Sequence, residues 1–163
     1  MPVTDVTKDV DNRRLVMTAH FDAPVERLWQ VYADPRQLEK VWGPPGYPAT
    51  FVDHDLAPGG RMTYYMTGPD GDRFHGYWDV VEVDQPRSFS FDDGFANDDF
   101  TPDAALPVGR NHYSFSAHEG GTRAVYESVY PTAEALQQVL DMGAVEGATA
   151  AIGQIDELLA LSS

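Results

Sequence analysis

The chain has 163 residues, contains no cysteine and carries a formal net charge of −15, with 26 Asp and Glu against 11 Lys and Arg. Such an acidic surface repels phosphate backbones and anionic lipid, so neither nucleic acid nor a membrane is an expected partner. The absence of cysteine excludes disulfides, thiol catalysis and thiolate zinc sites, and no apolar run reaches the roughly 18 residues of a membrane span. We expect a cytoplasmic protein without a secretory signal.

The beginning of the chain divides into a tail and the start of one domain. Residues 1–11 are polar and mixed in charge, which predicts a flexible N-terminal tail. Residues 12–163 form the predicted single domain, a length that supports a sizeable core. Apolar and polar side chains alternate from 13 to 21, which indicates a strand.

Two short helices are expected after this strand. Asp22 is a suitable N-cap for the first helix and Pro24 suits its first turn. Asp34 and Pro35 repeat this signal for the second helix. The glycines and prolines of residues 42–48 then predict an irregular loop.

Tight turns rich in glycine and proline separate the next segments, which is typical of an antiparallel meander. The predicted strands are 50–56, 61–67, 74–83, 88–91, 108–117 and 122–130. Residues 92–106, rich in aspartate, are expected to form a solvated loop, and whether it acts as a lid stays open. Residues 131–161 repeat small and apolar side chains at intervals of three and four, which predicts one long helix.

These elements predict an α+β fold with a curved, seven-stranded antiparallel sheet around the long C-terminal helix. An open curved sheet has one apolar face, and the long helix is the only element large enough to cover it. We expect an apolar cavity between the sheet and the helix.

This order of elements, together with eight local motifs, resembles the helix-grip layout of the START/SRPBCC superfamily and its bacterial AHSA-like family, relatives of the activator of the heat-shock ATPase chaperone. The similarity covers residues 13 to 161. It implies the fold and a pocket, but no particular chemistry, because members of such folds differ in the side chains of the cavity. The motifs are Phe21-Asp22-Ala23-Pro24, Trp42-Gly43-Pro44, Pro58-Gly59-Gly60, Gly68-Pro69-Asp70-Gly71, Val83-Asp84-Gln85-Pro86, Asp93-Gly94-Phe95-Ala96, Gly121-Thr122-Arg123 and the pair Met142-Gly143 and Glu146-Gly147.

The candidate ligand-binding residues are aromatic and methionine side chains of the strands and small residues of the last helix. Gly143 and Gly147 lie one turn apart in the predicted helix, where each costs roughly 1 kcal/mol relative to alanine. They either keep the helix wall flat beside a cavity or allow close packing on the sheet. Ala148, where similar proteins carry a bulkier residue, should leave further space. The full candidate set is Trp42, His54, Met62, Tyr64, Met66, Trp78, Phe95, Tyr113, Phe115, Tyr126, Met142, Gly143, Glu146 and Gly147.

The aromatic candidates also fit an ordinary core, although buried tyrosine hydroxyls need partners. Tyr77 and Trp78 lie on opposite faces of an apolar strand, and the pattern does not decide which faces inward. His54 shares a face with two apolar residues and is an inward-facing candidate. Its neighbours Asp53 and Asp55 point the other way, so we expect no metal site here.

Glu146 is the one candidate for a catalytic acid, because it is the acidic residue among the small residues of the helix. If it faces the cavity, burial raises its pKa; if it faces solvent, it has no special role. The serines show no nucleophile elbow, and the chain has no P-loop or dinucleotide motif, so no cofactor is expected.

The sequence leaves three alternative functions open. The first is binding of a small hydrophobic or amphipathic molecule in the cavity. The second is a cavity enzyme using acid–base chemistry on a ring or ester, and the third is a chaperone-ATPase-activator-like interaction protein, against which the acidity argues. A homodimer is left open.

Overall fold

The computed structural model describes residues 2–161; the first residue of the predicted tail and the last two of the predicted domain lie outside the described residues. The described chain forms one sheet of eight strands and four helices. The strands are β1 Val3–Asp9, β2 Arg14–Phe21, β3 Ala49–Asp53, β4 Arg61–Thr67, β5 Arg73–Asp84, β6 Ser88–Phe95, β7 Gly109–His118 and β8 Gly121–Val129. The helices are α1 Val25–Ala33, α2 Pro35–Trp42, α3 Ala133–Asp141 and α4 Ala144–Leu161.

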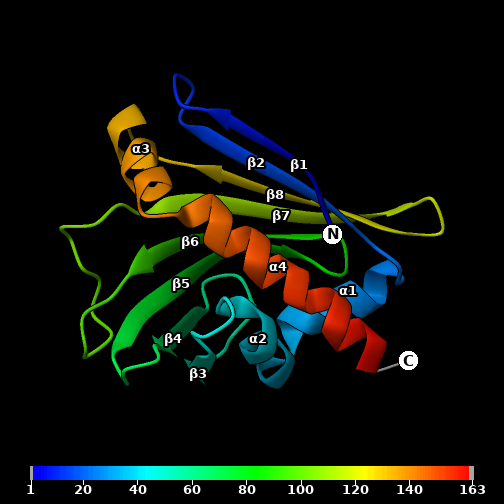
Figure 1. Ribbon diagram of the computed structural model, residues 1–163, viewed down its shortest axis with the longest axis horizontal. Coiled ribbons are helices and arrows are strands. Elements are labelled where there is room, and N and C mark those ends of the chain that lie inside the picture. The colour runs from blue at the N-terminus through cyan, green and yellow to red at the C-terminus, as the bar shows by residue number, and fades with distance from the viewer. Residues whose placement is uncertain (1, 162–163) are drawn as a thin grey trace.

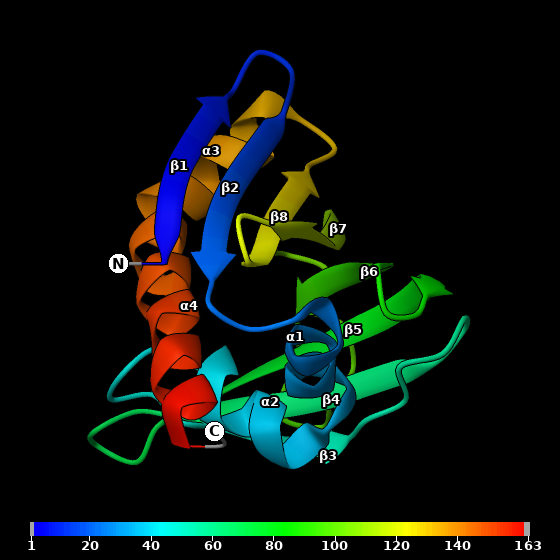
Figure 2. The same cartoon turned by 90° about the vertical axis from the view of Figure 1, so that its right-hand side faces the viewer.

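The sheet is antiparallel throughout, with the strand order β1-β2-β8-β7-β6-β5-β4-β3. Helix α4 crosses the sheet diagonally, and α1 and α2 lie beside its C-terminal half (Figure 1). Seen from the side, the sheet curves from β1 and β2 to β3 and β4, with α4 along one side (Figure 2). The predicted α+β helix-grip fold is confirmed, with eight strands in place of the expected seven.

The additional strand is the segment that we expected to be a flexible tail, and that expectation was wrong. β1 pairs with β2 from Val3↔Ala19 to Asp9↔Arg14. Its side chains are mostly exposed, and only Val3 and Val6 pack against the core. Because these two lie three residues apart, the segment lacks the alternation that marks a half-buried strand, and its place depends on backbone pairing with β2.

The C-terminal segment is broken into two helices, where the sequence predicted one. Gly143 has a φ of 86°, the left-handed conformation that glycine adopts at low cost, and its N–H donates to the carbonyl of Leu140. Thr132 caps the start of α3, where its side chain accepts a hydrogen bond from the N–H of Ala135 at 3.0 Å. The break lets α3 bury Leu136 against β2 while α4 turns across the sheet.

The capping predictions have mixed outcomes. Asp34 caps α2 as expected, since its carboxylate accepts from the N–H of Arg36 at 2.9 Å and Pro35 follows in the first turn. The N-cap of α1 is Pro24, which makes no side-chain capping bond, and Asp22 is exposed. Asp22 therefore does not have the predicted role.

The core lies between the inner face of the sheet and helices α1, α2 and α4. Its centre is a group of stacked aromatic rings, in which Trp78 lies 3.9 Å from Phe91 between ring centroids and Phe89 stacks on both. Trp29 of α1 contacts Phe89 edge-on. This packed half of the inner face holds α1 and α2 in place, and a cavity occupies the neighbouring part.

Candidate functional site

A cavity of about 310 Å³ lies between α4 and the inner face of the sheet. Its wall on the α4 side consists of small and aliphatic residues, and its wall on the sheet side is aromatic and polar. The α4 side is formed by Ala144, Gly147, Ala148, Ala151, Ile152 and Ile155. Strands β2, β4, β6, β7 and β8 supply most of the opposite side, including Tyr64, Tyr113 and Tyr126, and Tyr32 of α1 and Tyr130 after β8 complete it.

The small residues of α4 border open space. A Cβ atom on Gly147 would meet no atom within 4 Å beyond its chain neighbours and the nearby backbone of its own helix, and Ala148 and Ala151 also line the cavity. Close packing of helix on sheet would leave no such space. Gly143, by contrast, lies outside the lining and serves the turn between α3 and α4.

Asp93 is the one carboxyl group among the described residues of the lining. It is the sixth residue of β6, and strand alternation places it on the same inner face as Phe91. The hydroxyl of Tyr64 donates to its Oδ1 at 3.2 Å, the only hydrogen bond to this side chain within residues 2–161. Burial raises the pKa of Asp93 to about 7, and the hydrogen bond from Tyr64 opposes that shift.

Tyr64 reaches Asp93 because its cross-strand neighbour is a glycine. Tyr64 of β4 pairs with Gly76 of β5, and a Cβ atom at Gly76 would collide with the tyrosine hydroxyl. The ring therefore lies flat across β5 and directs its hydroxyl to β6. Burial, and secondly the charge of Asp93, raises the pKa of Tyr64 well above its usual value, so this tyrosine is a donor at neutral pH.

Four other polar side chains of the lining have partners within the protein. Ser128 donates to Oδ1 of Asn111 at 2.6 Å, and Nδ2 of Asn111 donates to the carbonyl of Gly109 at 3.2 Å. Tyr32 donates to the hydroxyl of Tyr126 at 3.0 Å. Asp93, by contrast, has one carboxylate oxygen without a partner within residues 2–161.

Six of the fourteen candidate ligand-binding residues line the cavity. Trp42, Tyr64, Met66, Tyr113, Tyr126 and Gly147 line the cavity.

Three other candidates, Met62, Trp78 and Phe115, are buried in the closed core. His54 is partly buried, and its Nε2 lies 2.9 Å from the carbonyl oxygen of Tyr32, outside the cavity lining. Phe95 is partly buried at the end of β6 and lies outside the cavity lining. Of the predicted loop 92–106, residues 92–95 belong to β6, and Asp93 is the one of its described residues that lines the cavity.

Glu146 and Met142 lie on the solvent side of the helical region. Glu146 is exposed and absent from the lining, and Met142 is 54% exposed. Of the two alternatives left open by the sequence, the structure favours the one in which Glu146 faces solvent and has no special role. The break at Gly143 restarts the helix, and this phase turns Gly147 and Ala148 toward the sheet with Glu146 away from it.

The orientation of β5 is also settled. Trp78 faces inward and packs on Phe91, and Tyr77 faces outward over Gly94 with the Arg61 guanidinium 5.2 Å from its ring centroid. Neither ring reaches the cavity.

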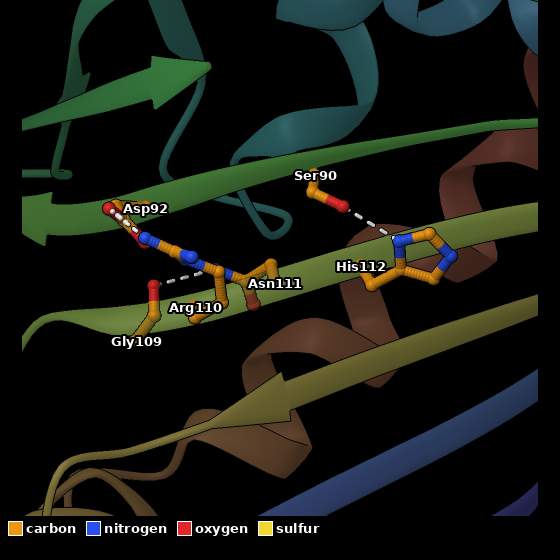
Figure 3. Close-up of polar contacts among 6 residues, drawn as sticks. All are labelled: Ser90, Asp92, Gly109, Arg110, Asn111 and His112. Atoms are coloured by element: carbon orange, nitrogen blue, oxygen red, sulfur yellow. Dashed lines mark hydrogen bonds and ion pairs between the residues drawn. The ribbon is translucent and has the colours of Figure 1, made fainter. Parts of the chain in front are cut away.

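A serine–histidine pair occurs on the outer face, where β6 and β7 run side by side. Ser90 Oγ lies 2.7 Å from Nδ1 of His112, next to the ion pair of Asp92 and Arg110, as Figure 3 shows. Within residues 2–161 no carboxylate hydrogen-bonds to His112, and neither member of the pair lines the cavity. The pair therefore lacks the orienting group and substrate pocket of a nucleophilic site.

No three His, Asp or Glu side chains in the described part of the chain gather as metal ligands. No helix among residues 2–161 is both long and apolar enough to cross a membrane.

Residues 22–160 match the family model described as "Activator of Hsp90 ATPase homolog 1-like protein". The chain belongs to this family. The AHSA-like resemblance inferred from the sequence motifs is thereby confirmed.

Solved structures of similar length agree with this assignment. Protein Ms6760 from Mycobacterium smegmatis is 65% identical, with 97% of each chain covered and a TM-score of 0.90. A protein from Arthrobacter aurescens is 41% identical, with 97% of this chain and 92% of that chain covered and a TM-score of 0.93. The AHSA1 protein from Silicibacter pomeroyi, 22% identical over 92% and 99% of the two chains with a TM-score of 0.75, shares the fold. Comparison with curated proteins gave no match.

Proposed function

We propose that this AHSA-like protein binds a small amphipathic molecule in the cavity between α4 and the sheet. The observation that carries the proposal is the open space beside Gly147 and Ala148, enclosed by apolar walls with Asp93 among the sheet residues. Ligand sites in proteins are typically apolar cavities of about 300–1,000 Å³ with a few placed polar groups, and this cavity is at the small end of that range. A molecule of one or two rings fits such a volume.

The test fills the cavity from the helix side. Ala148→Trp places an indole in the open space, and 1-naphthylmethanol serves as the probe, with binding measured by calorimetry and by NMR shifts of cavity residues. We expect the wild-type protein to bind the probe and Ala148→Trp to lose binding while its free energy of unfolding changes by less than about 1 kcal/mol.

Ala150→Trp is the matched control, because Ala150 lies on the exposed side of the same helix and should leave binding intact. The proposal fails if the wild-type protein binds no probe. It also fails if Ala148→Trp destabilises the fold by about 1–3 kcal/mol, as expected for overpacking of a filled core.

A second candidate function is acid–base catalysis at Asp93. A carboxyl group with a pKa of about 7 is suited to transfer protons near neutral pH. The remaining titratable groups of the lining are tyrosines, and burial raises the pKa of Tyr64, Tyr113 and Tyr126 well above its usual value, so a second group matched to neutral pH is missing. Hydrolysis of 1-naphthylmethyl acetate by the wild type and not by Asp93→Asn would favour the enzyme.

The description of the matching family raises activation of a chaperone ATPase, but the formal net charge of −15 argues against that role here. A cytoplasmic location remains part of the proposal and is supported by the lack of cysteine.

A further inference from the structure

The geometry points to an amphipathic amine as the ligand, with its protonated nitrogen bound to Asp93 and its apolar part against α4. This inference rests on the proposed binding function and names the chemistry that the cavity selects. Its basis is the combination of a carboxyl group without a cation, an aromatic wall beside that carboxyl group and an apolar wall opposite.

The charge of the lining is one-sided. Among residues 2–161, the cavity wall contains no lysine, arginine or histidine, and Asp93 is its one group that becomes charged near neutral pH. The titratable side chains facing Asp93 are Tyr64 from β4, Tyr113 from β7 and Tyr130 after β8, and each is a neutral phenol at pH 7 because burial raises its pKa. The residues of α4 in the lining are aliphatic or glycine and add no charge.

An ionised carboxylate in this position is costly unless a positive group approaches it, because burial removes its hydration. The protein supplies one neutral hydrogen bond from Tyr64 at 3.2 Å, and the second carboxylate oxygen has no partner within residues 2–161. An ammonium group provides both a positive charge and donors for that oxygen. A ligand carboxylate would be repelled at the same place.

The aromatic residues near Asp93 favour a cation further. Tyr64 contacts Trp42 edge-on at 5.9 Å between ring centroids, and Tyr113 contacts Tyr126 edge-on at 4.6 Å. All four rings border the cavity. The negative faces of such rings attract ammonium groups, most strongly where water is excluded.

The apolar end of the ligand has a defined place. Gly147, Ala148 and Ala151 leave the open volume on the α4 side, and Met17 and Ile155 complete an aliphatic surface there. A primary amine on a short linker to a ring system can occupy both regions at once.

The test compares three probes with one ring system: 1-naphthylmethylamine, 1-naphthylmethanol and 1-naphthoic acid. Calorimetry at pH 8, where Asp93 is mostly ionised, should show the amine binding about tenfold tighter than the alcohol, because hydrogen bonds to charged partners are stronger than neutral ones. The acid should bind more weakly than the alcohol. Between pH 6 and pH 8 the affinity for the amine should rise as Asp93 ionises, and the affinity for the alcohol should stay level.

The variant Asp93→Asn keeps the shape of the side chain and removes its charge. It should lose about tenfold in affinity for the amine, and this affinity should no longer depend on pH. Its affinity for the alcohol should stay within a few fold of the wild-type value, which shows that the cavity is intact. Asp92→Asn is the matched control, since Asp92 is the neighbouring carboxylate on the outer face and is paired with Arg110. It should leave all three affinities unchanged.

The outcomes separate the inference from the proposed function. If the alcohol binds and Ala148→Trp abolishes that binding, but the amine is no tighter or Asp93→Asn has no selective effect, the binding function stands and the amine inference is overturned. Tighter binding of the acid overturns it as well. If no probe binds, the proposed function itself fails.

Discussion

Two adjacent residues of β6, Asp92 and Asp93, experience opposite surroundings because successive side chains of a strand point to opposite faces of the sheet. Asp92, on the outer face, accepts hydrogen bonds from Nε and Nη2 of Arg110 at 2.6 and 3.0 Å. Asp93, on the inner face, has a tyrosine hydroxyl as its sole described hydrogen-bond partner. The same chemical group therefore contributes to a solvated ion pair on one side and forms an unpaired acid on the other.

The contrast extends along both faces. On the outer face Arg61 pairs with Asp79 across β4 and β5, and Arg14 pairs with Glu127 across β2 and β8. Such exposed pairs contribute little to stability. The inner face uses aromatic packing instead, and Asp93, the one Asp or Glu among the described residues that line the cavity, carries a pKa raised to about 7. A group that is costly to bury and lies at a cavity is a candidate for function, whereas the outer pairs are explained by solubility and pairing alone.

The largest expected effect comes from the packed half of the inner face. Phe91→Ala removes a fully buried ring that stacks on Trp78 and contacts Tyr113. We expect a loss of about 3–5 kcal/mol in the free energy of unfolding, measured by urea denaturation. Phe91→Leu, which retains most of the volume, should lose much less, and equal losses in the two variants would contradict the role of the stack.

The second effect concerns the pH dependence of stability and tests the unpaired acid directly. Asp93 titrates at about 7 in the folded protein, against an ordinary value of 3.8. Between these pH values the folded protein retains a proton that the unfolded chain has released, so this group lowers stability as pH rises through the window and has a constant effect outside it.

Asp93→Asn should remove this decline and stabilise the protein at pH 8 by about 2 kcal/mol. The full pKa difference between the folded and unfolded protein corresponds to roughly 4 kcal/mol, and we expect less because the cavity admits some solvation. Chemical denaturation at pH 4, 6 and 8 measures it. Asp92→Asn should retain the decline, and an identical pH profile for wild type and Asp93→Asn would contradict the raised pKa.

The fold was largely predictable because regular patterns and turn residues determine it. Alternation identified β2, and the glycine–proline turns identified the meander from β3 to β8. The pattern missed β1, whose strand depends on pairing with β2, and missed the break at Gly143, because a glycine inside an apolar repeat of three and four gives no sign of a left-handed φ. Pairing and backbone conformation of this kind are tertiary effects.

The cavity was predicted in outline and its polar centre was missed. The small residues at 147 and 148 left open whether the helix borders a cavity or packs closely, and both line the cavity of the structure. Asp93 was expected in a solvated loop because aspartates surround it. Continuing the alternation of Phe89 and Phe91 by one more step would have placed Asp93 inward, since β6 extends to Phe95. Glu146 was the candidate acid instead because it lies among the small residues of the helix, but its side chain is exposed while Gly147 and Ala148 line the cavity.

The smallest expected effect is on the outer face, where the Asp92–Arg110 pair can be measured by a double-mutant cycle with Asp92→Asn and Arg110→Gln. The pair has good two-point geometry, with N–O distances of 2.6 and 3.0 Å, but the side chain of Arg110 is 59% exposed. Water screens the attraction, and the two side chains lose rotamer freedom on pairing, so we expect a coupling energy of about 0.5 kcal/mol that falls further at 1 M salt. Urea denaturation of the four proteins at low and high salt gives this energy. A coupling above about 2 kcal/mol, or one insensitive to salt, would show that water does not screen the charges of the outer face. The surroundings of Asp92 and Asp93 would then not differ in solvation, and that difference could not explain why one carboxylate is paired and the other is left for a ligand.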